Sequence, residues 1–208
     1  MGNLRRRDAE VTDRDRLLGW LDRQTHGCLA YLRHDGSPGI VSLNFARWGE
    51  HLVFHGAREG EKAHALVRGA EVSFMVAEPL ALLPSYLFDR HLACPATNWY
   101  RSVVIHGRVQ PIEDPAAKAA ALQALMQKLQ PEGGYAPIAD TERYAKSLAS
   151  TAVYALPLDE MTGKFKLGQN LPRAKRAMVA RFLRERDGAL DRLTLIAMDE
   201  MGLLEPGG

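Results

Sequence analysis

The chain lacks several features that would assign it to a specialised class of protein. Only two of its 208 residues are cysteines, Cys28 and Cys94, and they stand far apart and outside any metal-ligand spacing. The formal net charge of +2 is too small to argue for a nucleic-acid partner. No apolar run approaches the roughly 18 residues of a membrane span, and no apolar segment follows the N-terminal arginines as in a signal peptide. We therefore expect a reduced, cytoplasmic protein.

Further absences narrow the chemistry. The chain has no Gly-x-Gly-x-x-Gly turn, which is the pyrophosphate-binding signature of dinucleotide-binding folds. His91 and Cys94 are three residues apart, but no second pair of ligands accompanies them, so we predict no metal site. No side chain stands out as a dedicated general acid or base.

A glycine-bearing turn between a short strand and a helix, over residues 55–66, organises the chain. Gly56 and Gly60 keep this turn open, and Lys62 stands at the start of the helical pattern. Free backbone N–H groups and the helix dipole favour an anion at such a position, and Lys62 adds a full positive charge. Arg58 is a candidate second cation. The pattern predicts a phosphate cradle, and a solvated lysine at the start of a surface helix is the alternative.

Periodicity predicts a mainly β protein with antiparallel strands and peripheral helices. The expected strands cover residues 28–32, 40–46, 51–55, 71–76, 100–109 and 151–156. The expected helices cover residues 12–27, a short segment from Lys62 with Val67 on its apolar side, and residues 114–132, 139–148, 172–186 and 190–198. Residues 1–11 and 78–98 lack periodicity, and two prolines predict an irregular excursion in the second segment.

Six or seven short antiparallel strands most easily close into a small barrel. We predict this domain over residues 1–160, with residues 161–208 as a helical extension packed on it. One small barrel does not cover both faces of strands that carry Leu43, Phe45, Val103 and Ile105, so these residues predict a homodimer. The basic helix over residues 172–186 is expected to pack on the barrel rather than on DNA.

Three segments, in this order, resemble the FMN-binding split barrels of the pyridoxamine 5'-phosphate oxidase-like superfamily. Residues 35–44 are similar to the strand that lies along the flavin ring, residues 54–64 to the phosphate-binding turn, and residues 100–114 to the next flavin-contacting strand. The spacing is closest to the flavin-nucleotide-binding branch that includes the nitroimidazole-resistance proteins. Separately, residues 161–170 resemble a C-terminal segment of PaiB-type proteins, which are described as transcriptional regulators.

The resemblance implies which residues hold FMN. They lie on the flavin-contacting strands, on the glycine turn and in the PaiB-like segment: Val41, Ser42, Leu43, Asn44, His55, Gly56, Arg58, Gly60, Glu61, Lys62, Ser102 and Lys166. It also implies two FMN sites at the interface of a homodimer, each walled by both chains. Lys164 and Lys166 either close over the partner's cofactor or end a solvated strand.

Two departures from the family pattern argue against pyridoxamine 5'-phosphate oxidase activity. Glu61 stands where the oxidases have an arginine before the phosphate lysine, so we expect Glu61 to point away from a phosphate and Arg58 to substitute. No histidine follows His106, so the Arg-x-His substrate motif near the C-terminus is missing.

The expected function is therefore that of an FMN-dependent oxidoreductase, which passes electrons or hydride from NADH or NADPH to a small acceptor. The alternative is a PaiB-type sensor or transcriptional regulator that binds flavin without turnover and contacts DNA. Residues 161–170 favour the alternative, and the middle of the chain is neutral between the two.

Overall fold

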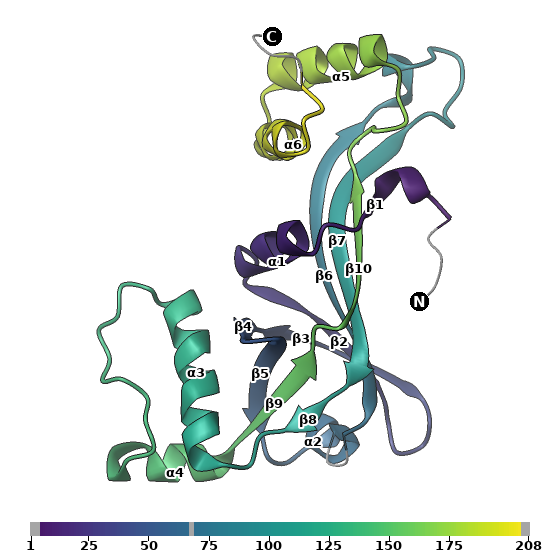
Figure 1. Cartoon of the computed structure of the whole chain (residues 1–208). Coiled ribbons are helices and arrows are strands. Elements are labelled where there is room, and N and C mark those ends of the chain that lie inside the picture. Colours follow the sequence, from purple (N-terminus) through teal and green to yellow (C-terminus); the bar gives the residue numbers. More distant parts are fainter. Residues whose placement is uncertain (1–4, 67–68, 205–208) are drawn as a thin grey trace. The chain divides into compact units, whose positions relative to one another are not determined.

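The computed structural model describes residues 5–66 and 69–204 (Figure 1). These residues form a six-stranded sheet in the order β1-β10-β7-β6-β2-β3 and a four-stranded sheet in the order β4-β5-β9-β8. The strands are β1 (Glu10–Val11), β2 (His26–Leu32), β3 (Pro38–Asn44), β4 (Ala46–Trp48), β5 (His51–Ala57), β6 (Glu71–Leu83), β7 (Thr97–Arg108), β8 (Gln110–Pro111), β9 (Thr151–Pro157) and β10 (Glu160–Lys166).

Helices flank these strands. They are α1 (Arg14–Asp22), α2 (Glu61–Leu66), α3 (Pro115–Leu129), α4 (Glu142–Ser150), α5 (Arg173–Arg186) and α6 (Ala189–Glu200), with short 3-10 turns η1 (Arg7–Ala9) and η2 (Ser85–Leu87). The prediction of a mainly antiparallel β protein with peripheral helices is confirmed.

The described chain divides into two compact units, each built from separate segments of the sequence. Unit 1 contains residues 5–12, 77–102 and 163–204, and unit 2 contains residues 13–66, 69–76 and 103–162. The predicted domain boundary between residues 160 and 161, with a helical extension after it, stays a prediction.

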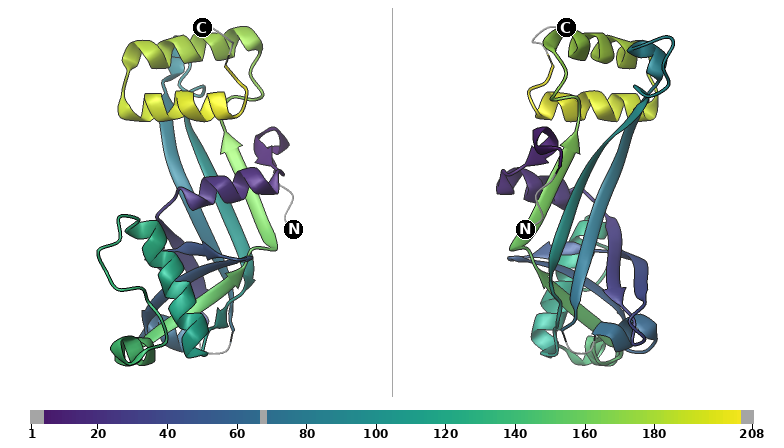
Figure 2. Two further views of the ribbon diagram at one scale, coloured as in Figure 1. Left: turned by 60° about the vertical axis from the view of Figure 1, so that its left-hand side comes forward. Right: turned by 90° about the vertical axis from the view of Figure 1, so that its right-hand side faces the viewer.

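Unit 2 is built on two antiparallel strand pairs. β2 pairs with β3, placing Cys28 opposite Ser42, and β5 pairs with β9 over its whole length. Helix α3 packs beside β4, β5 and β9 (Figure 2). Aromatic rings fill the interior, with the Phe45 and Phe74 ring centroids 5.4 Å apart in an edge-to-face pair. Phe54 of β5 stacks on the same Phe74 ring, with the centroids 6.1 Å apart, so this packing positions the end of β5, from which the glycine turn begins.

Aspartates begin two helices of unit 2. The Asp13 carboxylate accepts a hydrogen bond from the Arg16 N–H at 3.1 Å, and that of Asp114 accepts one from the Ala117 N–H at 2.8 Å. Both bonds satisfy helix N–H groups that lack an intrahelical partner. The helix predicted over residues 12–27 is shorter, since α1 ends at Asp22 and Gly27 lies in β2. At Gly27 a Cβ atom would lie 2.4 Å from the Phe74 ring, so glycine is needed there for packing.

The prediction of an irregular segment over residues 78–98 is wrong for its first part, since β6 continues through Pro79 to Leu83. Alternate residues remain buried up to Val76, and burial resumes at Leu80 and Ala81. Proline cannot donate to a strand ladder. Two residues further on, the Ala81 N–H donates at 2.8 Å to the hydroxyl of Thr194 on α6. A helix therefore supplies the acceptor for this N–H group.

Two other expectations about strands are corrected. The sequence predicts β9 as the last strand, but β10 follows it, and Glu10 and Val11 of β1 pair with Lys164 and Gly163 of β10. Burial alternates along the end of β10, as in other strands. The sequence did not reveal this strand because one of its buried positions is Gly163, which has no apolar side chain. The expected loose N-terminal segment contains η1 and β1 in its described part. Residues 1–4 and Val67 lie outside the described residues.

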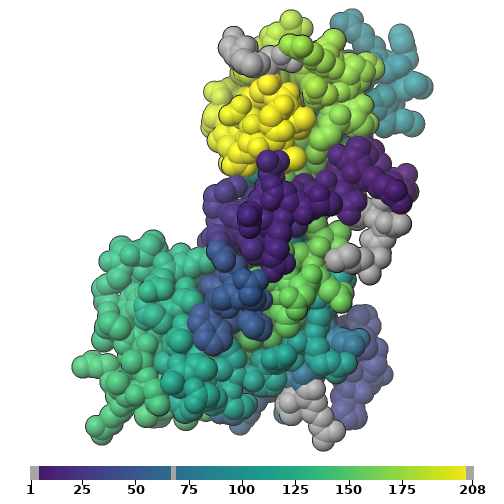
Figure 3. Space-filling model, viewed as in Figure 1, coloured from purple at the N-terminus to yellow at the C-terminus, as the bar shows by residue number. Residues whose placement is uncertain are grey.

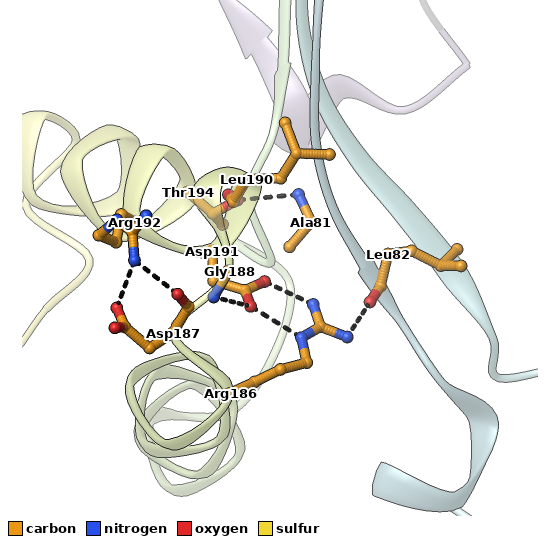
Figure 4. A network of polar contacts seen from close by, with 9 residues as sticks. All are labelled: Ala81, Leu82, Arg186, Asp187, Gly188, Leu190, Asp191, Arg192 and Thr194. Atoms are coloured by element: carbon orange, nitrogen blue, oxygen red, sulfur yellow. Dashed lines mark hydrogen bonds and ion pairs between the residues drawn. The ribbon is translucent and has the colours of Figure 1, made fainter.

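Helices α5 and α6 form an antiparallel pair within unit 1, and α6 lies against α5 in the space-filling view (Figure 3). Figure 4 shows the polar contacts at their junction. The buried Asp191 carboxylate accepts hydrogen bonds from the Arg186 guanidinium and from the Gly188 N–H, the latter at 2.9 Å. Arg186 also donates to the Leu82 carbonyl on β6 at 3.0 Å. The bonds to Asp191 hold α5 and α6 together, and the bond to Leu82 connects this helical pair to β6.

The residues that predicted a dimer interface are placed differently from the expectation. Val103 and Ile105 are fully buried and Phe45 is 2% exposed, so the core of the chain itself covers these three, whereas Leu43 is half-buried. The large apolar side chains that do stay exposed on these strands of unit 2 are Leu32, Ile40 and Met75. Register places these residues on one face of β3, β2 and β6.

Candidate functional site

The glycine turn of unit 2 joins the end of β5 to the start of α2. Gly60 has a φ of +98°, a left-handed conformation that glycine adopts without strain. Its carbonyl accepts a hydrogen bond from the His64 N–H at 3.1 Å, which begins the helix. Lys62 follows as the second residue of α2, as the sequence predicts.

The Lys62 side chain folds back over Gly56 on β5. Its Nζ atom donates to the His55 carbonyl at 3.4 Å, and a Cβ on residue 56 would lie 2.4 Å from this Nζ atom. The ammonium therefore occupies the space that a side chain on residue 56 would fill. An ammonium has three N–H donors, and this long bond uses one of them.

The surroundings of Lys62 are partly desolvated. Burial lowers the pKa of the half-buried Lys62 ammonium. Desolvation, and then the nearby Lys62 charge, lower the pKa of the His55 imidazole. Among the described residues no carboxylate pairs with Lys62. Because a partly desolvated cation gains from a negative partner, the turn favours an anion.

Glu61 does not supply that negative partner, although it is adjacent in sequence. Its carboxylate accepts a hydrogen bond from the Tyr31 hydroxyl at 2.8 Å and forms an ion pair with Arg33 at 2.9 Å. The hydrogen bonds from Tyr31 and Arg33 lower the pKa of Glu61. The Glu61 carboxylate, which is the departure from the family pattern, is thus bound by Tyr31 of β2 and by Arg33 in the turn after it.

Arg58 makes contacts of its own. Its guanidinium donates to the Ala149 carbonyl at 2.9 Å and to the Glu113 carboxylate at 3.1 Å. Together with Tyr154 it lines a cavity of about 200 Å³ in unit 2. Its predicted role as a second phosphate cation stays a prediction.

The four predicted flavin residues on β3 alternate in exposure. Val41 and Leu43 are half-buried, whereas Ser42 and Asn44 are exposed. The Asn44 side-chain amide donates to the Thr25 carbonyl at 3.0 Å.

The remaining two predicted residues belong to unit 1, and their role toward a flavin also stays a prediction. Ser102 is half-buried on β7. Lys166 ends β10, and its ammonium donates to the hydroxyl of Thr97 and, at 3.1 Å, to the Asn98 carbonyl.

A larger cavity in unit 2, of about 560 Å³, escaped sequence reasoning. Ser73 on β6 and His106 on β7 line it, and the Ser73 hydroxyl and the His106 Nδ1 atom are 2.9 Å apart. Arg108 and Glu71, also at its wall, form an ion pair at 2.9 Å. The only signal in the sequence is that polar residues alternate with apolar ones on both strands.

Metal-ligand clusters and membrane-spanning helices are both absent from the described residues. Residues 5–66 and 69–204 contain no group of three or more His, Cys, Asp or Glu side chains that could hold a metal ion. No helix in this part of the chain is both long and apolar enough to span a membrane.

The family of the chain follows from a sequence comparison. The family model described as "Pyridoxamine 5'-phosphate oxidase" matches residues 13–165, which is more than half of the chain. The chain therefore belongs to this family, and the predicted resemblance is confirmed. The match covers both the glycine turn and β3. No curated protein matches the chain.

Solved structures share the fold. The FAD and heme binding protein from Mycobacterium smegmatis is 26% identical, with a TM-score of 0.64 over 76% of this chain and 73% of that chain. The flavocytochrome from Azotobacter vinelandii is 24% identical, with a TM-score of 0.67 over 79% and 72% of the two chains. A putative 5-nitroimidazole antibiotic resistance protein from Bacteroides thetaiotaomicron is 24% identical, with a TM-score of 0.58 over 74% and 85%. The last two likenesses concern the fold alone.

Proposed function

We propose that the protein is an FMN-binding oxidoreductase that passes electrons from NADH or NADPH to a small acceptor. The observation that carries the proposal is the Lys62 ammonium, which lies over Gly56 at the start of α2 in a chain of this family. A bound flavin supplies the redox chemistry. The protein supplies a cation and free backbone N–H groups for the phosphate, and β3 as a wall.

The residues present fit such a cofactor at its phosphate end. Lys62 is half-buried and pairs with no carboxylate in the described part of the chain, while Glu61 is held by Tyr31 and Arg33. FMN is proposed rather than FAD because the turn offers one phosphate cradle and the chain has no dinucleotide-binding glycine turn. The Mycobacterium smegmatis relative, named for FAD and heme, makes FAD the alternative to be separated by experiment.

We further propose that the protein acts as a cytoplasmic homodimer. Leu32, Ile40 and Met75, which are 63%, 69% and 43% exposed, share one face of unit 2 and offer an apolar surface to a second copy. Ile40→Glu is expected to convert the dimer to monomers in light scattering, while Leu129→Glu on α3 leaves it intact. A monomer in the unmodified protein contradicts this arrangement.

The absorbance spectrum of the purified protein tests the function. A yellow protein that NADPH or NADH bleaches, and that air or an added acceptor restores, is the expected result. Chromatography of acid-released cofactor then distinguishes FMN from FAD. A colourless protein that takes up neither flavin would overturn the proposal.

The PaiB-like segment over residues 161–170 supports a second candidate, a flavin-binding regulator without turnover. Its expected behaviour is different: the yellow protein is inert to both nicotinamides and retards promoter DNA in a gel. The bleaching experiment therefore separates the two functions.

A further inference from the structure

Unit 1 contains a cavity of about 470 Å³ that is separate from the glycine turn. Its wall combines the segment before β7, the end of β10 with the turn that follows, and the first turn of α5. Lys166 and Asn170, from the PaiB-like segment, contribute to this wall. The proposed oxidoreductase function does not account for this cavity.

The cavity has an excess of positive charge. Arg6, Lys166 and Lys175 line it, and Asp89 is the one carboxylate among the described lining residues. The Asp89 carboxylate is already engaged, because it accepts hydrogen bonds from the N–H groups of His91 at 2.8 Å and Leu92 at 3.0 Å. Arg6 is itself paired with the Asp8 carboxylate at 2.7 Å. Lys166 and Lys175 therefore carry the positive excess, and the cavity attracts anions.

Lys166 is the cation that is best placed to meet a ligand. It is half-buried, and its two hydrogen bonds to Thr97 and Asn98 leave the third ammonium donor for another acceptor. Desolvation lowers the pKa of Lys166, and the charges of Arg6 and Lys164 lower it further. Desolvation and the nearby positive charges thus disfavour the charged form of Lys166, and a negative group in the cavity would favour it again.

The first turn of α5 adds to the excess of positive charge in the cavity. Pro172 occupies the N-cap position without a side-chain hydrogen bond, and the turn contains no acidic residue. It carries Lys175 instead, a cation at the positive end of the helix dipole. This placement is unfavourable by itself and becomes favourable when an anion lies beside it.

The rest of the wall is mixed: Thr97 and Asn170 are polar, and the apolar part is formed by Phe88, Pro95, Ala96, Trp99 and Leu171. Trp99 is 2% exposed, and Phe88 is half-buried. Gly168 has a φ of +78°, and a Cβ there would lie 2.6 Å from the Trp99 ring, so the turn after β10 packs directly on the indole. Because that turn covers the indole, the half-buried Phe88 is the aromatic side chain that an apolar group can contact here, while the lysines hold its charged end.

We propose that this cavity binds a small organic anion whose phosphate lies against Lys166 and Lys175 and whose aromatic body contacts Phe88. The chemical class is an aryl phosphate. Phenyl phosphate is the probe for this class, inorganic phosphate carries only the charge, and phenol carries only the ring.

Cys94 provides a local readout, because this exposed thiol lines the cavity whereas Cys28 lies in unit 2. The full-length protein is alkylated with iodoacetamide, and both cysteine peptides are followed by mass spectrometry. Phenyl phosphate is expected to slow alkylation of Cys94 with a saturable dose dependence and to leave Cys28 unchanged. Inorganic phosphate and phenol are expected to protect only at much higher concentrations.

Variants test the assigned cations. Lys166→Gln is expected to raise the half-protecting concentration about tenfold or more, as for a charge-assisted hydrogen bond, and Lys175→Gln about threefold, as for an exposed ion pair. Lys164→Gln is the matched control, since Lys164 lies on the same strand with its ammonium 5.5 Å from the Tyr100 ring centroid and outside the cavity wall. Because Lys175 is exposed, Lys175→Gln keeps the test valid if Lys166→Gln fails to fold.

Three results would overturn the proposal: no protection of Cys94 by phenyl phosphate, equal protection by phenol, or unchanged protection in both Lys166→Gln and Lys175→Gln. Loss of protection in Lys62→Ala alone would place the anion in unit 2 and would also overturn it. The flavin spectrum, recorded on the same samples, reports on the oxidoreductase proposal separately.

Discussion

A Cβ atom on residue 56 would lie 2.4 Å from the Nζ atom of Lys62 and 3.1 Å from its Cε atom. Cβ atoms do not approach other heavy atoms so closely, so Lys62 takes this position only because residue 56 is glycine. The glycine at the end of β5 and the lysine at the start of α2 therefore act as one unit. Two predictions about flavin binding depend on this relationship.

Lys62→Ala is expected to weaken FMN binding without unfolding the protein. A charge-assisted hydrogen bond contributes about 1.5–3 kcal/mol, which corresponds to a loss of affinity of about ten- to a hundredfold. Lys62→Arg should retain part of the affinity, because the charge remains while the shape changes. Titration by flavin fluorescence quenching measures each affinity.

Riboflavin is the control ligand for this prediction, because it has no phosphate and its affinity should hardly change. Lys146→Ala, which removes an exposed lysine on α4, is the control variant. Equal losses for FMN and riboflavin would mean that Lys62 is a packing residue and not a phosphate ligand.

Gly56→Ala is expected to displace the Lys62 ammonium and to reduce FMN affinity in the same direction as Lys62→Ala. The clash involves the far end of a flexible side chain, so the free energy of unfolding should change by less than about 1 kcal/mol. The effects of Gly56→Ala and Lys62→Ala should not add in the double variant, because both remove the same contact. Additive losses of FMN affinity in the double variant would mean that Gly56 and Lys62 act independently. Gly19→Ala, with no atom within 4 Å of the new Cβ, is the control.

Local signals in the sequence were sufficient for the glycine turn. Gly60, Lys62 and the apolar run before them lie within one short segment, so strand, turn and helix could be predicted together. The same holds for α3 and α5, whose patterns are long. The course of β6 beyond Val76 was missed because Pro79 breaks the local pattern, and the acceptor for the Ala81 N–H comes from Thr194, a residue 113 positions away.

Contacts between distant segments account for the other gaps. Ser73 and His106 lie on different strands, 33 positions apart, so no motif connects them. The partners of Glu61 and Arg58 could not be predicted either, because Tyr31 and Glu113 reach these residues only through folding. Sequence patterns thus identified the cation at the turn but not the ion pairs around it.

Arg101→Ala is expected to destabilise the protein by about 3 kcal/mol. The Arg101 side chain is 6% exposed and forms ion pairs with Glu78 at 2.7 Å and Glu200 at 2.6 Å. Removing it leaves the mostly buried Glu78 carboxylate without this cation, which is the costly way to break a buried ion pair.

Urea denaturation measures the change, and Arg192→Ala is the matched control. The ion pair of Arg192 with Asp187 is 58% and 68% exposed, so its loss should cost less than about 1 kcal/mol. Similar costs for the two variants would mean that burial does not decide the strength of the Arg101 contacts.

Lys128 on α3 should make the stability of the protein depend on pH in the alkaline range. Its ammonium lies 3.9 Å from the Phe45 ring centroid and donates to the Leu21 carbonyl at 3.2 Å. Desolvation is the main cause that lowers the pKa of Lys128 to about 8, from 10.5 in the unfolded chain.

The sign of this dependence follows from the protons bound in each state. Below pH 8 both states carry the charge, and the full cost of desolvating it is present. Between about pH 8 and 10.5 the folded state releases the proton while the unfolded state keeps it, so the free energy of unfolding rises with pH. The rise should be on the order of 1 kcal/mol, after allowance for solvent screening of this half-buried group. Lys128→Met should abolish the rise and be more stable than the unmodified protein at pH 7. Urea denaturation of both proteins from pH 7 to 10.5 tests this, and an identical pH dependence would show that the Lys128 pKa is not lowered by folding.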